Sequence, residues 1–451
     1  MLFRSDSIPV DEVIPIPFRA GPAQPNLAGY AIAIFDEGNT LPQTATAPQT
    51  PLGFATATSQ EGVYTFTTPV LSQGSHFLTA RVMMIDPASP QQTGFGPRSQ
   101  VFEIIVDSIA PNVAFGDTAH TTDGLHPDSD SGVIPQAPTF VDRITNDRTP
   151  TFFGVSEANA VVRAYLDRNN SGVVDSNDVF LGMTIALPVD GSNQYPNGEW
   201  QLTSTVDLNA PNAITLGGAT VNLTVDGTRR ILVTAEDLAG NVSDPQSLRI
   251  MVDTQGPQVT NVFITADPTY NLFELKPTPR PTPLVHQLTI SVQDFPFRDP
   301  VNFPDHPALA PIVAVDPGHY LVTGDYNGRI PVKSVTFTPD PLVNGAIATG
   351  KVTLTFFEPL PDDRFTLTVY DEIVDIAGNN LDGESNAQQP VGTPNFPSGD
   401  GQPGRDFVAR FTIDSRPEIG TWAAGNVWID TNGNDFFDPN NLDYVNRDRS
   451  E

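Results

Sequence analysis

The sequence predicts an all-β chain of antiparallel β-sandwiches in tandem. Short runs of β-branched and aromatic residues alternate with polar ones and are separated by Gly, Pro, Asn and Asp, which is typical of strands and turns. No stretch shows the apolar period of a helix, and the 44 prolines are roughly twice the usual share of about 5%. One strand–turn–strand ending also recurs along the chain. Together these features favour several small sandwiches over one large domain.

The recurring ending is clearest near residue 240. The run Arg230–Ala235 alternates in polarity, and Asp237-Leu238-Ala239-Gly240-Asn241 follows it as a polar turn. Gly240 can take the positive φ angle that such a turn needs. The run Leu248–Val252 then leads out to Asp253. We therefore predict two neighbouring strands joined by a tight turn.

Three copies of the exit sequence set the spacing of the units. Each is a hydrophobic residue, then Asp, then Ser or Thr, then a nearby Pro, and the aspartates are Asp107, Asp253 and Asp414. They lie 146 and 161 residues apart, which is too long for a solenoid repeat and suits an array of domains. The turn sequence returns once, as Asp375-Ile376-Ala377-Gly378-Asn379.

The first two copies match further inside. Four pairs of segments correspond in order: 29–36 with 160–167, 52–53 with 181–182, 61–66 with 197–202, and 74–80 with 227–235. We predict sandwiches over residues 1–108, 109–254 and 255–415, and the start of a further truncated module over residues 416–451.

The chain is strongly acidic, with 53 Asp and Glu residues against 23 Lys and Arg and a net charge of −30. This charge opposes binding to nucleic acid and to anionic membrane surfaces, and favours binding of cations. Because the chain has no cysteine, disulfides and Cys-ligated zinc are excluded. No apolar run reaches signal-peptide or membrane-spanning length. We expect a piece of a longer secreted protein, stabilised by calcium and not inserted in a membrane.

The sharpest candidate site is a twelve-residue loop, residues 167–178. It places hard oxygen ligands at the spacing that wraps them around one Ca²⁺ ion, with Gly172 at the bend. The loop resembles the calcium loops of EF-hands and dockerins. The predicted ligands are Asp167, Asn169, Ser171, the carbonyl of Val173, Asp175 and Asp178.

The flanks of this loop differ from those families. Val161–Leu166 and Val179–Gly182 read as strands, and the last position is Asp178 where a bidentate Glu is usual. We therefore expect a static structural ion at the tip of a hairpin, with Val174 anchoring the loop to the core. The alternative is an ordinary solvated turn.

Two weaker sets of candidates follow. The segment 430–441 repeats the calcium-loop pattern with predicted ligands Asp430, Asn432, Asn434 and Asp438, although position six is Asp435 and not Gly. The predicted domain junctions offer a second set: Asp107, Asn146, Asp147, Asp237 and Asp253. For the junction residues we favour a role as turn caps, in which Asp and Asn bond their own backbone.

Residues 145–154, the Trp200 strand, the turn 237–241 and the exit 252–257 together resemble a bacterial Ig-like domain of large adhesins and biofilm-associated surface proteins. Residues 258–415 are more similar to a variant in S-layer proteins, through 326–328, 365–369 and 375–379. The resemblance implies Ig-like β-sandwiches, an extracellular or cell-surface location, an adhesive or stalk role and no catalysis. It also implies a cell-surface glycan or protein as a candidate ligand.

Enzyme motifs are absent from the sequence. The six histidines are scattered, and no H-E-x-x-H, G-x-S-x-G or P-loop occurs. We therefore predict a non-catalytic, calcium-stabilised stalk or adhesion region. The alternative is a set of carbohydrate-binding or spacer domains of a large secreted hydrolase whose catalytic module lies outside this chain. That alternative needs exposed aromatic residues, and Trp200 is expected to face the core.

Overall fold

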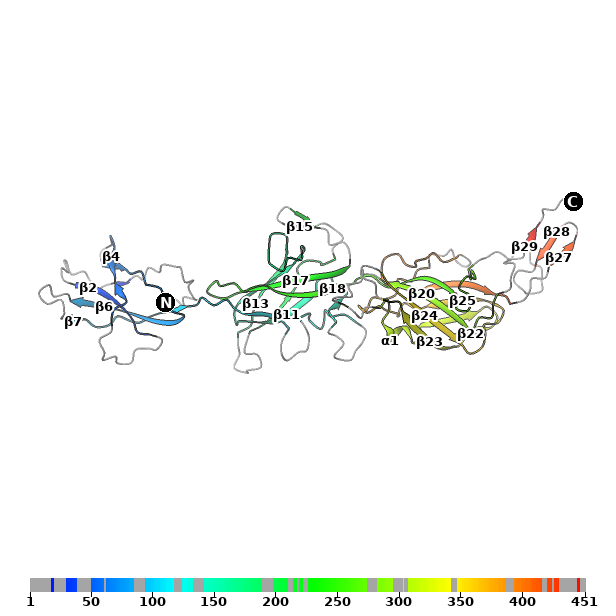
Figure 1. Cartoon of the computed structure of the whole chain (residues 1–451), viewed down its shortest axis with the longest axis horizontal. Helices are drawn as coiled ribbons and strands as arrows, with labels where there is room; N and C mark the ends of the chain where they lie inside the picture. Colours follow the sequence, from blue (N-terminus) through cyan, green and yellow to red (C-terminus); the bar gives the residue numbers. More distant parts are fainter. Residues whose placement is uncertain are drawn as a thin grey trace.

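Three β-rich units follow one another along the long axis of the molecule (Figure 1). The computed structural model describes residues 18–19, 30–38, 50–60, 62–84, 94–116, 124–132, 142–188, 198–209, 214–216, 219–221, 226–273, 282–294, 303, 307–341, 347–385, 393–415, 420–423, 426–429 and 444–446. We call residues 18–106 the first unit, 113–252 the second and 258–413 the third. All strand pairings of the described residues up to 413 lie within one unit.

The first unit has two small sheets. One has the order β1-β5-β4, with strands Phe18–Arg19, Val63–Thr65 and Thr56–Ala57. The other has the order β3-β2-β6-β7, and β8 also pairs with β6; these are Gly53–Phe54, Tyr30–Asp36, Gly74–Met84, Gly94–Phe95 and Phe102–Val106.

The second unit is a sandwich of a five-stranded and a three-stranded sheet. The larger has the order β10-β18-β17-β12-β13: Ile144–Thr145, Gln246–Val252, Gly227–Glu236, Val161–Leu166 and Val179–Ile185. The smaller has the order β14-β11-β9: Gly198–Thr203, Thr151–Ser156 and Val113–Phe115. A separate hairpin joins β15 (Ile214–Leu216) and β16 (Ala219–Val221).

The third unit packs two four-stranded sheets on each other. One has the order β19-β20-β24-β23: Gln258–Ile264, Gln287–Asp294, Ala348–Phe356 and Val332–Pro339. The other has the order β22-β21-β25-β26: Gly328–Ile330, Tyr320–Gly324, Asp363–Val369 and Phe407–Ile413. Two short helical turns, α1 (Pro311–Ala314) and a 3₁₀ turn (Pro317–His319), precede β21.

Beyond residue 415 the described residues form one small antiparallel sheet. Its order is β27-β28-β29, with strands Gly420–Ala423, Asn426–Ile429 and Tyr444–Asn446.

The predicted fold class is confirmed: the described chain is nearly all β, and its strand pairings are antiparallel except for that of β10 with β18. Strands alternate buried and partly exposed side chains, as in β11 and β12, because each sheet has one face on its core. Trp200 is 2% exposed and faces the core as predicted. The sheet order β3-β2-β6-β8 of the first unit matches β13-β12-β17-β18 of the second, which agrees with the pairs of segments matched by sequence.

Candidate metal centre at the junction of the second and third units

Three carboxylates meet where the second unit passes the chain to the third. Asp253 directly follows β18, the last strand of the second unit, and its backbone N–H donates to the carbonyl of Thr145 at 2.8 Å. Because Thr145 belongs to β10, this bond continues the parallel β10–β18 ladder by one residue. The position of Asp253 is therefore fixed by the second unit.

Asp375 opens the second of the two D-x-A-G-N turns, after β25 in the third unit. Its carboxylate accepts the backbone N–H of Asn379 at 2.9 Å and the side-chain amide of the same residue at 2.8 Å. Gly378 takes a φ of +86°, which permits the chain to fold back over the carboxylate. This local turn chemistry orients Asp375.

Asp294 is the last residue of β20 and lies in the third unit. Its strand has the buried residues Leu288, Ile290 and Val292 at every second position, and Asp294 continues that series. The period of two therefore directs its carboxylate inward.

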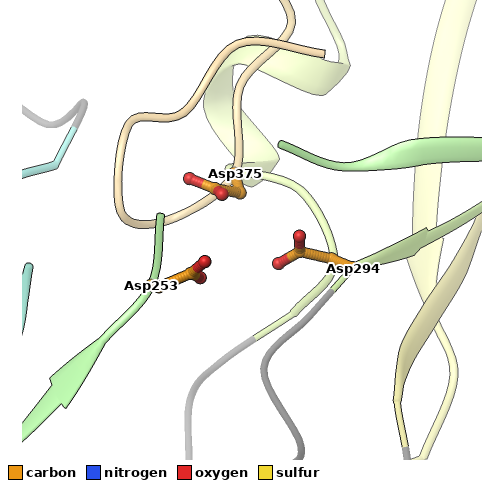
Figure 2. Close-up of side chains that lie close together, drawn as sticks. All are labelled: Asp253, Asp294 and Asp375. Carbon is orange, nitrogen blue, oxygen red and sulfur yellow. The ribbon is translucent and has the colours of Figure 1, made fainter. Parts of the chain in front are cut away.

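The three carboxylates face one another in Figure 2, from three separate segments of the chain. Asp253, Asp294 and Asp375 are 0% exposed, and a ligand oxygen from each lies within 4.8 Å of the others. Burial raises the pKa of Asp375 to about 7. Burial, and then the charges of Asp375, Asp294 and Asp226, raise the pKa of Asp253 well above its usual range.

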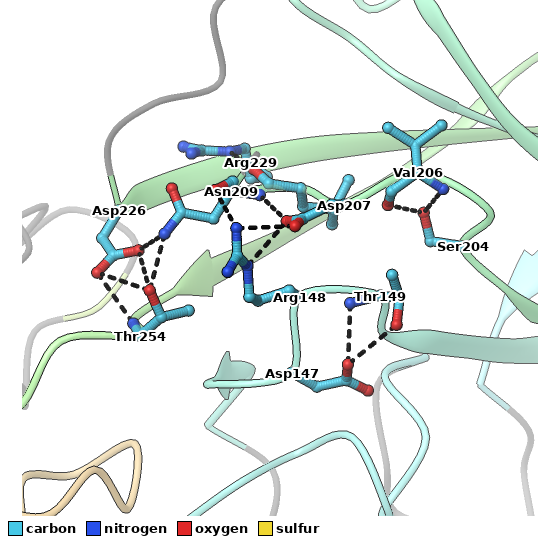
Figure 3. A network of polar contacts seen from close by, with 11 residues as sticks. Asp147, Arg148, Thr149, Ser204, Val206, Asp207, Asn209, Asp226, Arg229 and Thr254 are labelled. Atoms are coloured by element: carbon cyan, nitrogen blue, oxygen red, sulfur yellow. Dashed lines mark hydrogen bonds and ion pairs between the residues drawn. The ribbon is translucent and has the colours of Figure 1, made fainter. Parts of the chain in front are cut away.

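A polar network fixes the chain just beyond Asp253 (Figure 3). Asp226 is 4% exposed and accepts the backbone N–H of Thr254 at 2.9 Å and its hydroxyl at 3.0 Å. Asn209 donates its side-chain amide to Asp226 and, at 2.8 Å, to the Thr254 hydroxyl. The direction in which the chain leaves the second unit is therefore determined by side chains of that unit.

An apolar cluster lies between the same two units. Ile144 and Met251 of the second unit pack with Phe303 and Ala377 of the third, and the Arg143 guanidinium lies 5.7 Å from the centre of the Phe303 ring. The Ser131 hydroxyl donates to the carbonyl of Ala377 at 2.6 Å. The carboxylates thus lie in a packed, bonded interface.

The linker itself approaches the third unit closely. A Cβ atom added to Gly256 would lie 2.0 Å from the backbone oxygen of Asn380, a distance that no side chain tolerates. The neighbouring Pro257 carbonyl accepts the N–H of Asp382 at 2.9 Å. Glycine at position 256 is therefore required for this contact between linker and unit.

The junction of the first and second units repeats the arrangement in a more open form. Asp107 follows β8, Asp237 opens the first D-x-A-G-N turn, and Glu157 follows β11, which pairs with the first strand of its unit as β20 does in the third unit. Partial burial, then the charges of Asp237 and Asp107, raise the pKa of Glu157. Asp237 is 7% exposed, but Glu157 lies on the surface, so this group is less enclosed.

The predicted calcium loop at 167–178 joins β12 to β13, so the expected hairpin between strands is present. Its polar groups bond one another. Asp167 accepts the backbone N–H groups of Ser171 at 3.0 Å and Gly172 at 2.8 Å. The Arg230 guanidinium lies 3.6 Å from the Asp167 carboxylate, and the Asn169 amide donates to Asp175 at 2.8 Å.

Two details of this loop differ from a formed ion site. Val174 is 38% exposed, so the expectation that it anchors the loop to the core is wrong. Asp167, Asp175 and Asp178 are not among the described groups of three whose oxygens lie within 4.8 Å of one another. One oxygen, Oδ1 of Asp178, is buried without a hydrogen-bond partner and could bind a cation.

The other predicted ligands divide into two groups. Asp430, Asn432, Asn434 and Asp438 lie outside the described residues. Asp147 serves as a turn residue: its carboxylate accepts the N–H of Thr149 at 2.9 Å and the Ser129 hydroxyl at 2.7 Å. Asn146 donates its backbone N–H to the Ser131 hydroxyl at 2.7 Å. Of the junction residues named from sequence, Asp253 lies in a compact carboxylate cluster. The other two members of the cluster, Asp294 and Asp375, were not predicted as ligands.

The donor set at this junction suits a hard divalent cation. Ca²⁺ takes six to eight oxygen ligands, and carboxylates are its usual protein donors. Two further described acidic groups, Asp371–Glu372–Asp406 and Asp382–Glu384–Asp400, are more exposed. Among the described clusters only Asp253, Asp294 and Asp375 are buried at all three positions.

Comparison with known proteins gave neither a matching family model nor a matching curated protein. Among solved structures, fibronectin(III)-like modules of Clostridium thermocellum CbhA align with 14% identity and a TM-score of 0.23, covering 55% of this chain and 89% of theirs. The C-terminal domain of the Streptococcus agalactiae AgI/II polypeptide BspA aligns with 10% identity and a TM-score of 0.21, covering 60% and 96%.

The S-layer protein rSbsC(31-844) aligns with 11% identity and a TM-score of 0.14, covering 92% of this chain and 55% of that one. All three TM-scores are below 0.5, which is too low to assign a fold or a function to this chain. The assignment depends on its own strand order and sites. Within the described residues, no helix has both the length and the apolar character needed to cross a membrane.

Proposed function

We propose that this chain is a non-catalytic, calcium-stabilised stalk or adhesion region, built from Ig-like sandwiches, of a large bacterial secreted or cell-surface protein. The observation that supports it best is the group of three fully buried carboxylates between the second and third units. A divalent cation there would contact Asp253, which directly follows the last strand of the second unit, and two residues of the third unit. It would therefore join the two units directly.

Electrostatics gives the physical reason. Like charges held a few ångströms apart in a buried site repel one another strongly, because water screens them little. A bound Ca²⁺ ion offsets two of the three charges and gains ligands in the same step. The ion would bind the aligned pair of units and not a separated pair, so its binding free energy would stabilise the aligned state.

The rest of the chain is consistent with this role. A net charge of −30 and the absence of cysteine fit an extracellular protein that uses cations and not disulfides. Calcium ions are the proposed partners, at the junction and in the 167–178 loop. A cell-surface glycan or protein is the proposed ligand of an adhesive end.

Thermal unfolding of the whole chain in calcium and in EGTA tests the proposal, with Asp294→Asn as the key variant. We expect calcium to raise the Tm of the parent, by the equivalent of about 2.7 kcal/mol at a hundredfold excess over Kd. Asp294→Asn keeps the shape of the side chain and removes one charge, so it should be more stable than the parent in EGTA and gain less from calcium.

Asp340→Asn is a matched control, because Asp340 is partly exposed at the end of β23 and lies in none of the carboxylate clusters. It should respond to calcium as the parent does. If the parent gains nothing from calcium, or Asp294→Asn gains as much as the parent, the junction does not hold the ion.

One observation favours the alternative role as accessory domains that bind a carbohydrate. A groove of about 420 Å³ on the second unit is lined by ten residues, among them His126, Phe153, Ile185, Glu199 and Gln201. Trp200 contributes little to stacking because it is buried. Affinity electrophoresis in soluble polysaccharides would test this: retardation of the parent but not of Phe153→Ala would favour the alternative.

A further inference from the structure

The geometry points to the asparagine that ends each D-x-A-G-N turn as the residue that joins one unit to the unit before it. We infer that Asn241 and Asn379 are positioning residues, each of which docks its turn onto the exit strand of the preceding unit. The docking surface is the turn, and its partner is the end of a strand that is directly followed by Asp. The inference deepens the proposed stalk function and rests on it for its biological role, but the contacts themselves involve no cation.

At the second junction the Asn379 side-chain nitrogen bridges two units. It donates to the Asp375 carboxylate of its own turn at 2.8 Å and to the backbone carbonyl of Asp253 at 3.0 Å. Asn379 is 7% exposed, and both aspartates are fully buried. Hydrogen bonds enclosed in this way are costly to lose, because the groups left behind would be buried without partners.

At the first junction the same contacts recur with different residues. The Asn241 side-chain nitrogen donates to the Asp237 carboxylate at 2.9 Å and to the backbone carbonyl of Asp107 at 3.1 Å. In both turns the backbone N–H of the asparagine also donates to its aspartate at 2.9 Å. The two bridges span 134 and 126 residues of sequence, so neither follows from local chain geometry.

The chemistry explains why asparagine occupies this position. Both neighbours, a carboxylate and a carbonyl, are acceptors, so the group between them must supply two N–H donors from one short side chain. The asparagine NH₂ does so, whereas aspartate supplies only acceptors when ionised and alanine supplies neither. At both junctions the shorter intermodular contact is to a backbone carbonyl, so it requires a strand end in the right place. At the second junction a longer contact of 3.5 Å to the Asp253 carboxylate accompanies it.

Asn327 offers a matched control inside one unit. Its side-chain nitrogen donates to the Asp363 carboxylate at 2.8 Å, and its backbone N–H donates to the same carboxylate at 2.8 Å. This repeats the turn contacts of Asn379 without an acceptor from another unit. Asn327→Ala should therefore disturb a turn in the third unit and leave the junction intact.

Spin-label distance measurements on the whole chain can test the inference, since the parent has no cysteine and labels can be placed singly. Gln201→Cys and Lys351→Cys, both at exposed strand positions, report on the second junction. Thr67→Cys and Gln201→Cys report on the first. In the parent we expect one narrow population of label-to-label distances across each junction. Asn379→Ala should broaden the distances across the second junction only, and Asn241→Ala those across the first junction only.

The measurement is made in calcium and in EGTA, which separates this inference from the proposed calcium site. Broadening by Asn379→Ala in both conditions, with Asn327→Ala unchanged, supports the asparagine bridge whether or not calcium binds. Distance populations in Asn379→Ala and Asn241→Ala as narrow as in the parent would overturn it, as would equal broadening by Asn327→Ala. Circular dichroism of each variant shows that the units remain folded.

Discussion

At the scale of single residues, the most informative position is Asp294. Nothing local marks it as a ligand, because it ends a strand and belongs to no turn motif. Its position in the alternation of the strand does indicate a buried carboxylate: Leu288, Ile290 and Val292 define the buried face of β20, and Asp294 lies on that face. An acidic residue on the buried side of an alternating strand is costly unless it has a partner. That pattern in the sequence would have identified it.

The buried carboxylates predict an unusual pH dependence. Burial raises the pKa of Asp375 to about 7, and that of Asp253 is also raised, whereas an unfolded Asp titrates near 3.9. The folded state then binds more protons than the unfolded state between these values. The free energy of unfolding of the calcium-free protein should therefore fall as pH rises from about 4 to about 7.

Urea unfolding in EGTA across this pH range measures the effect. Asp294→Asn should show a shallower fall, because it removes one of the charges that raise the pKa of Asp253. Calcium should stabilise the parent more at pH 8 than at pH 5, since protons compete for the same oxygens. A calcium-free protein that becomes steadily more stable from pH 4 to pH 8 would contradict the prediction.

At the scale of elements, the hairpin loop 167–178 shows what a local pattern can and cannot predict. The strands on either side were predicted correctly, since alternation and turn residues are local signals. Whether the oxygens converge on an ion depends on side-chain rotamers, and here several of them bond within the loop. The carboxylate cluster at the junction was not predicted for a different reason: Asp253 was named from the sequence, but only the fold brings it together with Asp294 and Asp375.

Calcium binding by the 167–178 loop can be tested separately. We expect the double variant Asp175→Asn/Asp178→Asn to bind one calcium ion fewer than the parent in equilibrium dialysis, because it removes two of the predicted anionic ligands. Asp294→Asn should lower the stoichiometry independently, because the two sites share no residue. An unchanged stoichiometry in the double variant would identify the loop as a hydrogen-bonded turn.

The linker between the second and third units makes a second prediction at this scale. Gly256→Ala places a methyl group against the backbone oxygen of Asn380, and relieving such an overlap typically costs about 1–3 kcal/mol. We expect Gly256→Ala to lower the Tm and to weaken the contact between the linker and the third unit. Gly96→Ala is the control, because its added Cβ would lie 3.4 Å from the nearest atom; equal losses in both variants would argue against a specific contact at position 256.

At the scale of the whole molecule, the arrangement of units in a row makes length the property to measure. Small-angle X-ray scattering should give a longer maximum dimension in calcium than in EGTA, because the aligned junction is the state that the ion would bind. Asp294→Asn should show a smaller difference. High salt should change the EGTA state more than the calcium state, since it screens the repulsion of a chain with a net charge of −30. Equal dimensions in calcium and EGTA would mean that calcium does not align the units.

The parallel pairing of β10 with β18 has a mechanical consequence. One strand lies early in the second unit and the other carries the chain out of it, and their backbone bonds, Met251 to Arg143 at 2.9 Å and Asp253 to Thr145 at 2.8 Å, lie across the strands. Tension on the exit of the second unit would pull β18 along its own axis and therefore along β10. The bonds would then bear the load together, in shear, and would not open one after another. In the proposed stalk this resistance to shear would lie beside Asp253, the first residue after β18.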